Sequence, residues 1–143
     1  VVLADCVWER FSHDILLRSI KDLLSRSKDA RIYMVAGLHT GRSTLVHFFR
    51  HALAIGLCLV PVPPADVWPT CTLETTALPG SEHIMELEVG GTWDEHETPY
   101  LTGQRRPFLL HRGSPDQEDE PIQVRNHWLT VSCMAWAATE ATP

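Results

Sequence analysis

The chain has 143 residues, of which 44% are hydrophobic and 21% are charged, and its formal net charge is -6. A length of about 100 to 200 residues is typical of one domain, so we expect one domain at most. The composition excludes a disordered tail, a collagen and a disulfide-dense miniprotein. No apolar stretch approaches the ~18 to 20 residues of a membrane-spanning helix, and no cleavable signal pattern opens the chain.

Charge is distributed unevenly along the chain. Residues 1–60 carry 8 basic and 5 acidic side chains, whereas residues 61–143 carry 4 basic and 13 acidic ones. Phosphate binding needs clustered Lys and Arg, so the acidic half argues against a broad nucleic-acid surface. We interpret the acidic excess as a solvated face together with an acidic loop at about 113–121.

The cysteines predict neither a metal centre nor a disulfide framework. The chain has four of them, far apart and without a C-x-x-C pair: Cys6, Cys58, Cys71 and Cys133. Structural zinc sites normally bring such pairs, so we expect no structural metal. Without a secretion signal, a reducing compartment is the simpler inference. We therefore expect a cytoplasmic location, with the nucleus as an additional one.

The first predicted element is a strand at Val1–Val7, a continuous apolar run that only Asp5 interrupts. Runs without alternation are typical of strands that helices cover on both faces. A domain that begins directly on a core strand lacks a leading loop. We therefore expect an amino-terminal part to precede Val1 in the complete protein.

The next segments alternate between helix and strand. Ser12 is a candidate helix cap, a strand is predicted at Arg31–Leu38, and a second helix begins at about Ser43 and ends at Gly56. The apolar stripes are Leu16, Ile20, Leu23 and Leu24 in the first helix and Leu45, Phe48, Phe49, Ala52 and Leu53 in the second. Such alternation with short connections predicts an α/β fold with a parallel sheet and right-handed crossovers.

The pattern changes after Gly56. A short strand is possible at Leu57–Val62, and the prolines that follow predict a loop-rich insertion at about 59–82. Period-two alternation predicts a strand at Ile84–Val89, and His127–Trp136 is the last strand candidate, with a polar stretch between them. Strands joined without a helix pair antiparallel, so the sheet is predicted to be mixed.

Asp5 is the most informative single residue. It lies near the carboxyl end of a predicted buried strand, where open α/β sheets place ligand and catalytic groups. A carboxylate there is costly unless it is hydrogen-bonded or meets a cationic or polar substrate. Trp8 supplies an aromatic wall that could stack on a substrate or hold a cation. The competing interpretations are that Asp5 caps the following loop and that Trp8 packs in the core.

Two further motifs have the wrong spacing for the chemistry they suggest. The loop Gly37–Ser43 lies where a phosphate loop would, but its glycines are one residue too close and Arg42 stands in place of Lys. We favour a strand-to-helix turn there. His47 and His51 have the i, i+4 spacing of a helical zinc site, but the metalloprotease pattern needs Glu at Phe48. We therefore predict no metal.

Three segments, Leu3–Trp8, His13–Leu17 and Ala36–Arg42, carry a family resemblance. They resemble the carboxyl-terminal half of the fungal nicotinamide N-methyltransferase-like proteins. These belong to lysine methyltransferase family sixteen of the seven-strand, S-adenosylmethionine-dependent methyltransferases. Farther along, Ile84–Gly91 resembles the sixth strand of that family, Gln104–Phe108 resembles the segment after it, and Arg125–Trp128 resembles the start of the seventh. The resemblance is weak at 59–82.

The resemblance implies a fold, an activity and a site. The fold would be part of a Rossmann-like class I methyltransferase sheet, strands four to seven, mixed, with the last strand antiparallel. Asp5 and Trp8 match the family's D-x-x-[YF] motif, with Trp8 in the aromatic place, a departure that could change substrate choice. Ala4 and Asp5 would face S-adenosylmethionine, and Asp5 with Trp8 would frame the acceptor nitrogen.

The implied acceptor is a protein lysine, with a translation elongation factor as one such protein, or an N-terminal amine, or a small nicotinamide-like amine. No nucleic acid, membrane or metal partner is implied. Two cofactor-binding motifs of the family have no counterpart in this sequence: the glycine-rich loop after the first strand and the acidic residue after the second. We therefore expect the 143-residue chain alone to bind the cofactor poorly or not at all.

Two other readings remain open. The chain could be a truncated, catalytically inactive copy that serves only as an interaction module or is a relic without function. A phosphate-binding α/β protein is the third reading, and it needs a Lys and a wider glycine spacing that the sequence lacks.

Overall fold

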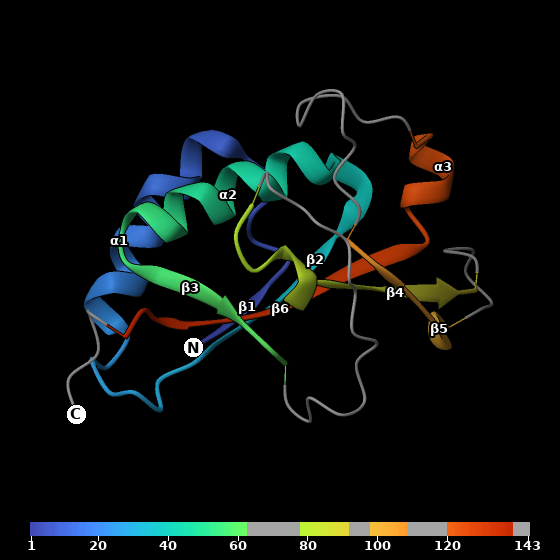
Figure 1. Cartoon of the computed structure of the whole chain (residues 1–143). Helices are drawn as coiled ribbons and strands as arrows, with labels where there is room; N and C mark the ends of the chain where they lie inside the picture. The colour runs from blue at the N-terminus through green and yellow to red at the C-terminus, as the bar shows by residue number, and fades with distance from the viewer. Residues whose placement is uncertain (63–77, 92–97, 109–119, 139–143) are drawn as a thin grey trace.

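A computed structural model describes residues 1–62, 78–91, 98–108 and 120–138 of the chain. These residues form a mixed sheet with helices beside it (Figure 1). The strands are β1 (Val2–Ala4), β2 (Ile32–Gly37), β3 (Leu57–Val60), β4 (Met85–Gly90), β5 (Tyr100–Pro107) and β6 (Trp128–Trp136). The helices are α1 (His13–Leu23), α2 (Arg42–Ala54) and α3 (Ile122–Arg125). The α/β class predicted from the sequence is confirmed.

The strand order places the end of the chain in the middle of the sheet. The order is β1-β2-β6-β4-β5, and β3 also pairs with β6. β1 and β2 are parallel, whereas β6 is antiparallel to β2, β3 and β4. The sheet is therefore mixed with an antiparallel last strand, as expected. The carboxyl ends of β1 and β2 meet the start of β6 at one edge, where the register pairs Gly37 with Leu129.

Both long helices pack on the same face of the sheet, as Figure 1 shows. Side chains of β1 and β2 alternate between this face and the opposite one: Leu3 and Met34 are buried, whereas Val2 is 74% exposed and Tyr33 is 40% exposed. The expectation of a first strand at Val1–Val7 buried on both faces is therefore wrong. The strand has three residues, and it turns away from the sheet after Ala4.

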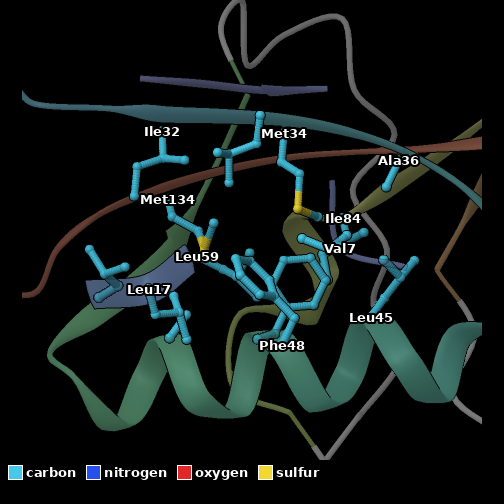
Figure 2. Close-up of a cluster of buried hydrophobic side chains, with 14 of the residues drawn as sticks. Val7, Leu17, Ile32, Met34, Ala36, Leu45, Phe48, Leu59, Ile84 and Met134 are labelled. Atoms are coloured by element: carbon cyan, nitrogen blue, oxygen red, sulfur yellow. The ribbon is translucent and has the colours of Figure 1, made fainter. Parts of the chain in front are cut away.

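The core lies between the sheet and α2 (Figure 2). Phe48 of α2 points at the methionines of two strands, Met34 and Met134, and all three side chains are buried. The predicted stripe of α2 is confirmed, with Leu53 at its partly buried margin. Truncating a buried phenylalanine to alanine costs about 3 to 5 kcal/mol, so Phe48 is a principal source of stability.

The predicted stripe of α1 is confirmed in part. Ile20 and Leu24 are buried and Leu16 packs against the core, whereas Leu23 is 76% exposed. His13 and Leu17 are buried positions that were not predicted. The buried positions follow the helical period from His13, and a hydropathy pattern passes over that residue because it is polar. Ser12 precedes the helix as expected, but its hydroxyl donates to Glu9 O instead of capping the helix.

β5 was expected to be part of a polar stretch without a strand. It pairs antiparallel with β4, and their register matches Met85 with Pro107 and Glu86 with Arg106. Its pattern is polar because β5 is joined to the sheet by backbone pairing and by ion pairs of Arg106. Of the predicted insertion at 59–82, residues 63–77 lie outside the described residues, as do Cys71 and most of the acidic loop at 113–121.

A buried carboxylate links β4, β5 and α2. Glu86, fully buried on β4, accepts two hydrogen bonds from Arg42, from Nε and Nη2, each 2.7 Å long. Arg106 of β5 donates to Glu86 as well and forms a two-pronged pair with Glu120 at 2.7 and 2.8 Å. Arg42 also reaches Glu120 at 3.2 Å. The two guanidinium groups balance the charge of the two carboxylates, and these ion pairs offset the free-energy cost of removing the charges from water.

The guanidinium of Arg106 also changes the acidity of its partner. Its hydrogen bonds to Glu120 lower the pKa of that carboxyl below the ordinary value, and partial burial works in the opposite direction. The charge of Arg42 lowers the pKa further. Glu120 therefore stays ionised well into the acidic range, and the four-residue network keeps its charges paired.

Replacing Glu86 with glutamine should lower the free energy of unfolding by about 3 kcal/mol, because Arg42, which is buried, and Arg106, which is partly buried, both lose a charged partner. Glu88→Gln on the same strand is the matched control. Its side chain accepts a hydrogen bond from the Thr102 hydroxyl, which an amide oxygen can also accept, so the loss should stay below about 1 kcal/mol. Urea unfolding of both variants measures the difference, and equal losses would contradict a special role for Glu86.

Candidate functional site

Asp5 is fixed in a left-handed backbone conformation directly after β1. Its φ is 48°, and it is the only non-glycine residue with positive φ among the described residues. Asp and Asn tolerate this region better than other side chains, at some cost. The backbone N–H of Asp5 donates to Val35 O at 2.8 Å, and its Oδ1 accepts from the N–H of Gly37 at 3.0 Å. Asp5 thus caps the end of β2 while the rest of its carboxylate remains exposed.

A pocket of about 560 Å³ lies at this edge of the sheet, within the size range of ligand sites. It is lined by Ala4, Asp5, Val35, Gly37, Leu38, His39, Ile122, Asn126, Trp128 and Leu129. The predicted site residues Ala4 and Asp5 are therefore both in it. Trp8 does not line the pocket, and its side chain is 54% exposed.

The aromatic wall of the pocket comes from Trp128, which the sequence analysis did not select. One face of its ring is covered by the guanidinium carbon of Arg106, 3.8 Å from the ring centroid. His39 and Asn126 were missed in the same way. His39 had a usable signal, because it follows the carboxyl end of the strand parallel to β1. Asn126 and Trp128 lie in the Arg125–Trp128 segment that resembles the start of the seventh strand, but their proximity to Asp5 depends on where β6 inserts in the sheet.

The loop after β2 is held in place by its neighbours. Leu38–Thr40 forms one 3₁₀ turn, and Arg125 Nη1 donates to the carbonyl oxygens of Leu38 at 3.1 Å and His39 at 2.8 Å. A Cβ at Gly37 would lie 2.5 Å from Nδ1 of His39, so any larger residue there would displace the imidazole. The loop is therefore a tight turn that brings His39 back toward Asp5.

The structure also accounts for Arg42, which stands where a phosphate loop has lysine. Its side chain is buried and bonded to Glu86 and Glu120. A guanidinium engaged with two carboxylates is not free to bind phosphate. The preference for a strand-to-helix turn over a phosphate site is supported by this arrangement.

A second polar cluster joins α1 to α2. Nε2 of the buried His13 lies 2.9 Å from Val7 O, which can only accept, so this nitrogen carries the proton. Nδ1 of the neutral ring then accepts from Nδ1 of His47, 2.9 Å away. His51 Nδ1 lies 2.7 Å from Asp14 Oδ1. His47 and His51, which have the spacing of a helical zinc site, thus each form a hydrogen bond with a residue of α1.

The described residues contain no group of three or more His, Cys, Asp or Glu side chains arranged to hold a metal ion. Burial lowers the pKa of His13 below its ordinary value, and it lowers the pKa of His47 in the same direction. The hydrogen bond from His51 lowers the pKa of Asp14. The cluster is therefore built around a neutral His13.

No protein-family model matches this chain, and neither curated proteins nor solved structures give a match. In the part of the chain that the structure describes, no helix has the length and apolar character needed to cross a bilayer.

Acidification should destabilise the fold through His13. Its pKa is lowered in the folded state, so the unfolded chain binds the proton more readily, and stability falls as the pH drops below the ordinary histidine value of about 6.5. The contribution of Asp14 is lost only near the much lower carboxyl range. Urea unfolding between pH 7.5 and 5.5 should show the fall, and His13→Asn should make it smaller without abolishing it, because the pKa of His47 is lowered too. Parallel curves for the two proteins would contradict this account.

Proposed function

We propose that this chain is the carboxyl-terminal part of an S-adenosylmethionine-dependent N-methyltransferase domain. The observation that carries the proposal is the position of Asp5. It lies at the carboxyl end of a parallel strand, in a strained conformation, with part of its carboxylate facing a pocket that also contains Ala4. Backbone strain of this kind is concentrated at functional sites. The family resemblance assigns these same two residues to the methyl donor and the acceptor.

The strand order supports the proposal. The resemblance implies strands four to seven of a Rossmann-like sheet, and β1, β2, β4 and β6 take those places in chain order. The first two are parallel, and the last is antiparallel and lies between β2 and β4. Two strands are additions to that scheme: β3, which pairs with β6, and β5, which pairs with the outer side of β4.

The residues that line the pocket are compatible with part of an S-adenosylmethionine site. The small residue Ala4 leaves space at the end of β1, and Asp5 follows it at the same pocket. S-adenosylmethionine supplies an electrophilic methyl group when it is bound. Ala4 and Asp5 would contact it, and the family motifs for its amino-acid and ribose portions have no counterpart in the sequence.

The chemistry of the pocket favours a cationic amine as the acceptor. The free part of the Asp5 carboxylate attracts an ammonium group, and the ring of Trp128 offers an apolar wall for the carbon chain that carries it. A protein lysine or an N-terminal amine has both features. A nicotinamide-like ring is the small-molecule form of the same proposal, and a translation elongation factor is one protein that could supply the lysine.

An inactive interaction module is the second candidate, and a specific observation favours it. Val2, Tyr33 and Val35 are 74%, 40% and 37% exposed on the face of the sheet opposite α1 and α2. Apolar side chains gathered on one face are typical of a contact surface. Labelling of cell lysate with tritiated S-adenosylmethionine and the complete gene product separates the two candidates. Transfer of label supports the enzyme, and its absence favours the module.

Asp5→Asn in the complete gene product should reduce methyl transfer roughly 10- to 100-fold, since one charge-assisted contact contributes ~1.5 to 3 kcal/mol. Asparagine tolerates the φ of 48° and can still accept from the N–H of Gly37, so the fold should be retained. Asp22→Asn on the exposed side of α1 is the control and should leave the rate unchanged. An unaltered rate for Asp5→Asn would remove the role assigned to Asp5.

Titration calorimetry gives a separate check on the cofactor. The 143-residue chain should bind S-adenosylmethionine weakly or not at all, because it lacks the two cofactor-binding motifs of the family. A micromolar dissociation constant for this chain would contradict that expectation.

A further inference from the structure

The pocket beside Asp5 contains a second group that can exchange a proton. Among the described residues that line it, the titratable side chains are Asp5 and His39. Imidazole is the side chain that takes up and releases a proton near neutral pH, whereas a carboxylate is a much weaker base. His39 is therefore the one lining side chain suited to accept a proton from a bound amine.

Gly37 brings the two side chains together. Its N–H donates to Asp5 Oδ1, and its missing Cβ leaves the space that the imidazole of His39 occupies. A Cβ built on Gly37 would lie 2.5 Å from His39 Nδ1 and 3.5 Å from Asp5 Oδ1. The carboxylate and the imidazole thus converge on the same glycine from two neighbouring parallel strands, β1 and β2.

The backbone of His39 is held from the other side of the pocket. Arg125, the last residue of α3, donates to the carbonyl oxygens of Leu38 and His39, and its Nε donates to Glu120 O. The charged groups beside His39 are thus the Asp5 carboxylate, which shares Gly37 with the imidazole, and the Arg125 guanidinium, which bonds the backbone carbonyl. Such a loop presents a side chain at a fixed place without needing to reorganise.

An amine that a carboxylate attracts arrives as an ammonium ion, which has no lone pair. A lysine amine has an ordinary pKa of about 10.4, so at neutral pH a base must remove a proton before the nitrogen can react. We propose that His39 is that base, and that the acceptor is a primary alkyl amine that enters the pocket charged. This inference rests on the proposed function and adds to it the proton acceptor and the charge of the substrate.

Proton removal and methyl transfer together need only His39, Asp5, the amine and S-adenosylmethionine. The imidazole of His39 takes one proton from the ammonium ion, and Asp5 holds the nitrogen in the pocket. The nitrogen lone pair then forms a bond to the methyl carbon of S-adenosylmethionine, and the carbon–sulfur bond breaks with its electron pair going to sulfur. The products are the methylated amine, S-adenosylhomocysteine and protonated His39, which returns its proton to solvent.

The test is the pH dependence of methyl transfer by the complete gene product and its His39→Asn variant. General-base catalysis contributes ~10²- to 10⁴-fold, so the variant should be at least about 100-fold slower at pH 7. Its rate should rise toward that of the wild type at alkaline pH, where the amine loses its proton unaided. His83→Asn, in the turn before β4, is the matched control and should follow the wild type throughout.

A second pair of variants tests the geometry. Gly37→Ala should slow transfer about as much as His39→Asn, because the new methyl group displaces the imidazole. In a His39→Ala background the same change at Gly37 should cost no further activity.

The outcomes separate the two proposals. If the wild type transfers methyl groups and His39→Asn matches it at every pH, the role of His39 is overturned and the proposed function stands. If the wild type transfers none to lysate proteins or to small amines, the proposed function fails, and the role of His39 fails with it.

Discussion

The carboxylate of Glu86 is the group on which the arrangement of this molecule depends. It is fully buried, and it accepts hydrogen bonds from Arg42 at the start of α2 and from Arg106 on β5. These three residues come from distant parts of the sequence, and an unpaired charge at any of them would be strongly unfavourable. The ion pairs therefore specify that α2, β4 and β5 meet at one end of the sheet, beside the edge that forms the pocket.

The same network extends to the pocket through Glu120. This residue pairs with both guanidinium groups, and its backbone oxygen accepts a hydrogen bond from Arg125. Arg125 in turn holds the carbonyl oxygens of the loop that carries His39. A series of hydrogen-bonded residues thus leads from the buried carboxylate to the backbone of His39 at the pocket. The loop owes its shape to contacts made outside it, together with the glycine at its start.

Segments with regular apolar patterns were predicted well, and segments that polar contacts hold were not. The patterns predicted α2 and β6 because their buried faces repeat at the helical and strand periods. They missed β5, whose place depends on Arg106. In α1 they predicted that Leu23 is buried, whereas His13 is the buried residue. At the site, the strand end identified Asp5, but Trp128 lies more than a hundred residues away and reaches the pocket only through the insertion of β6.

Trp128 links the stability of the ion-pair network to the shape of the pocket. One face of its ring lies against Arg106 of the buried network, and the same side chain forms a wall of the pocket. Replacing a buried ion network with well-packed apolar residues often raises thermal stability. In this protein such a redesign would remove the cation that fixes the tilt of the indole ring. A more heat-resistant version made in that way would have a differently shaped pocket, so the stability of the fold and the shape of the pocket are not independent variables here.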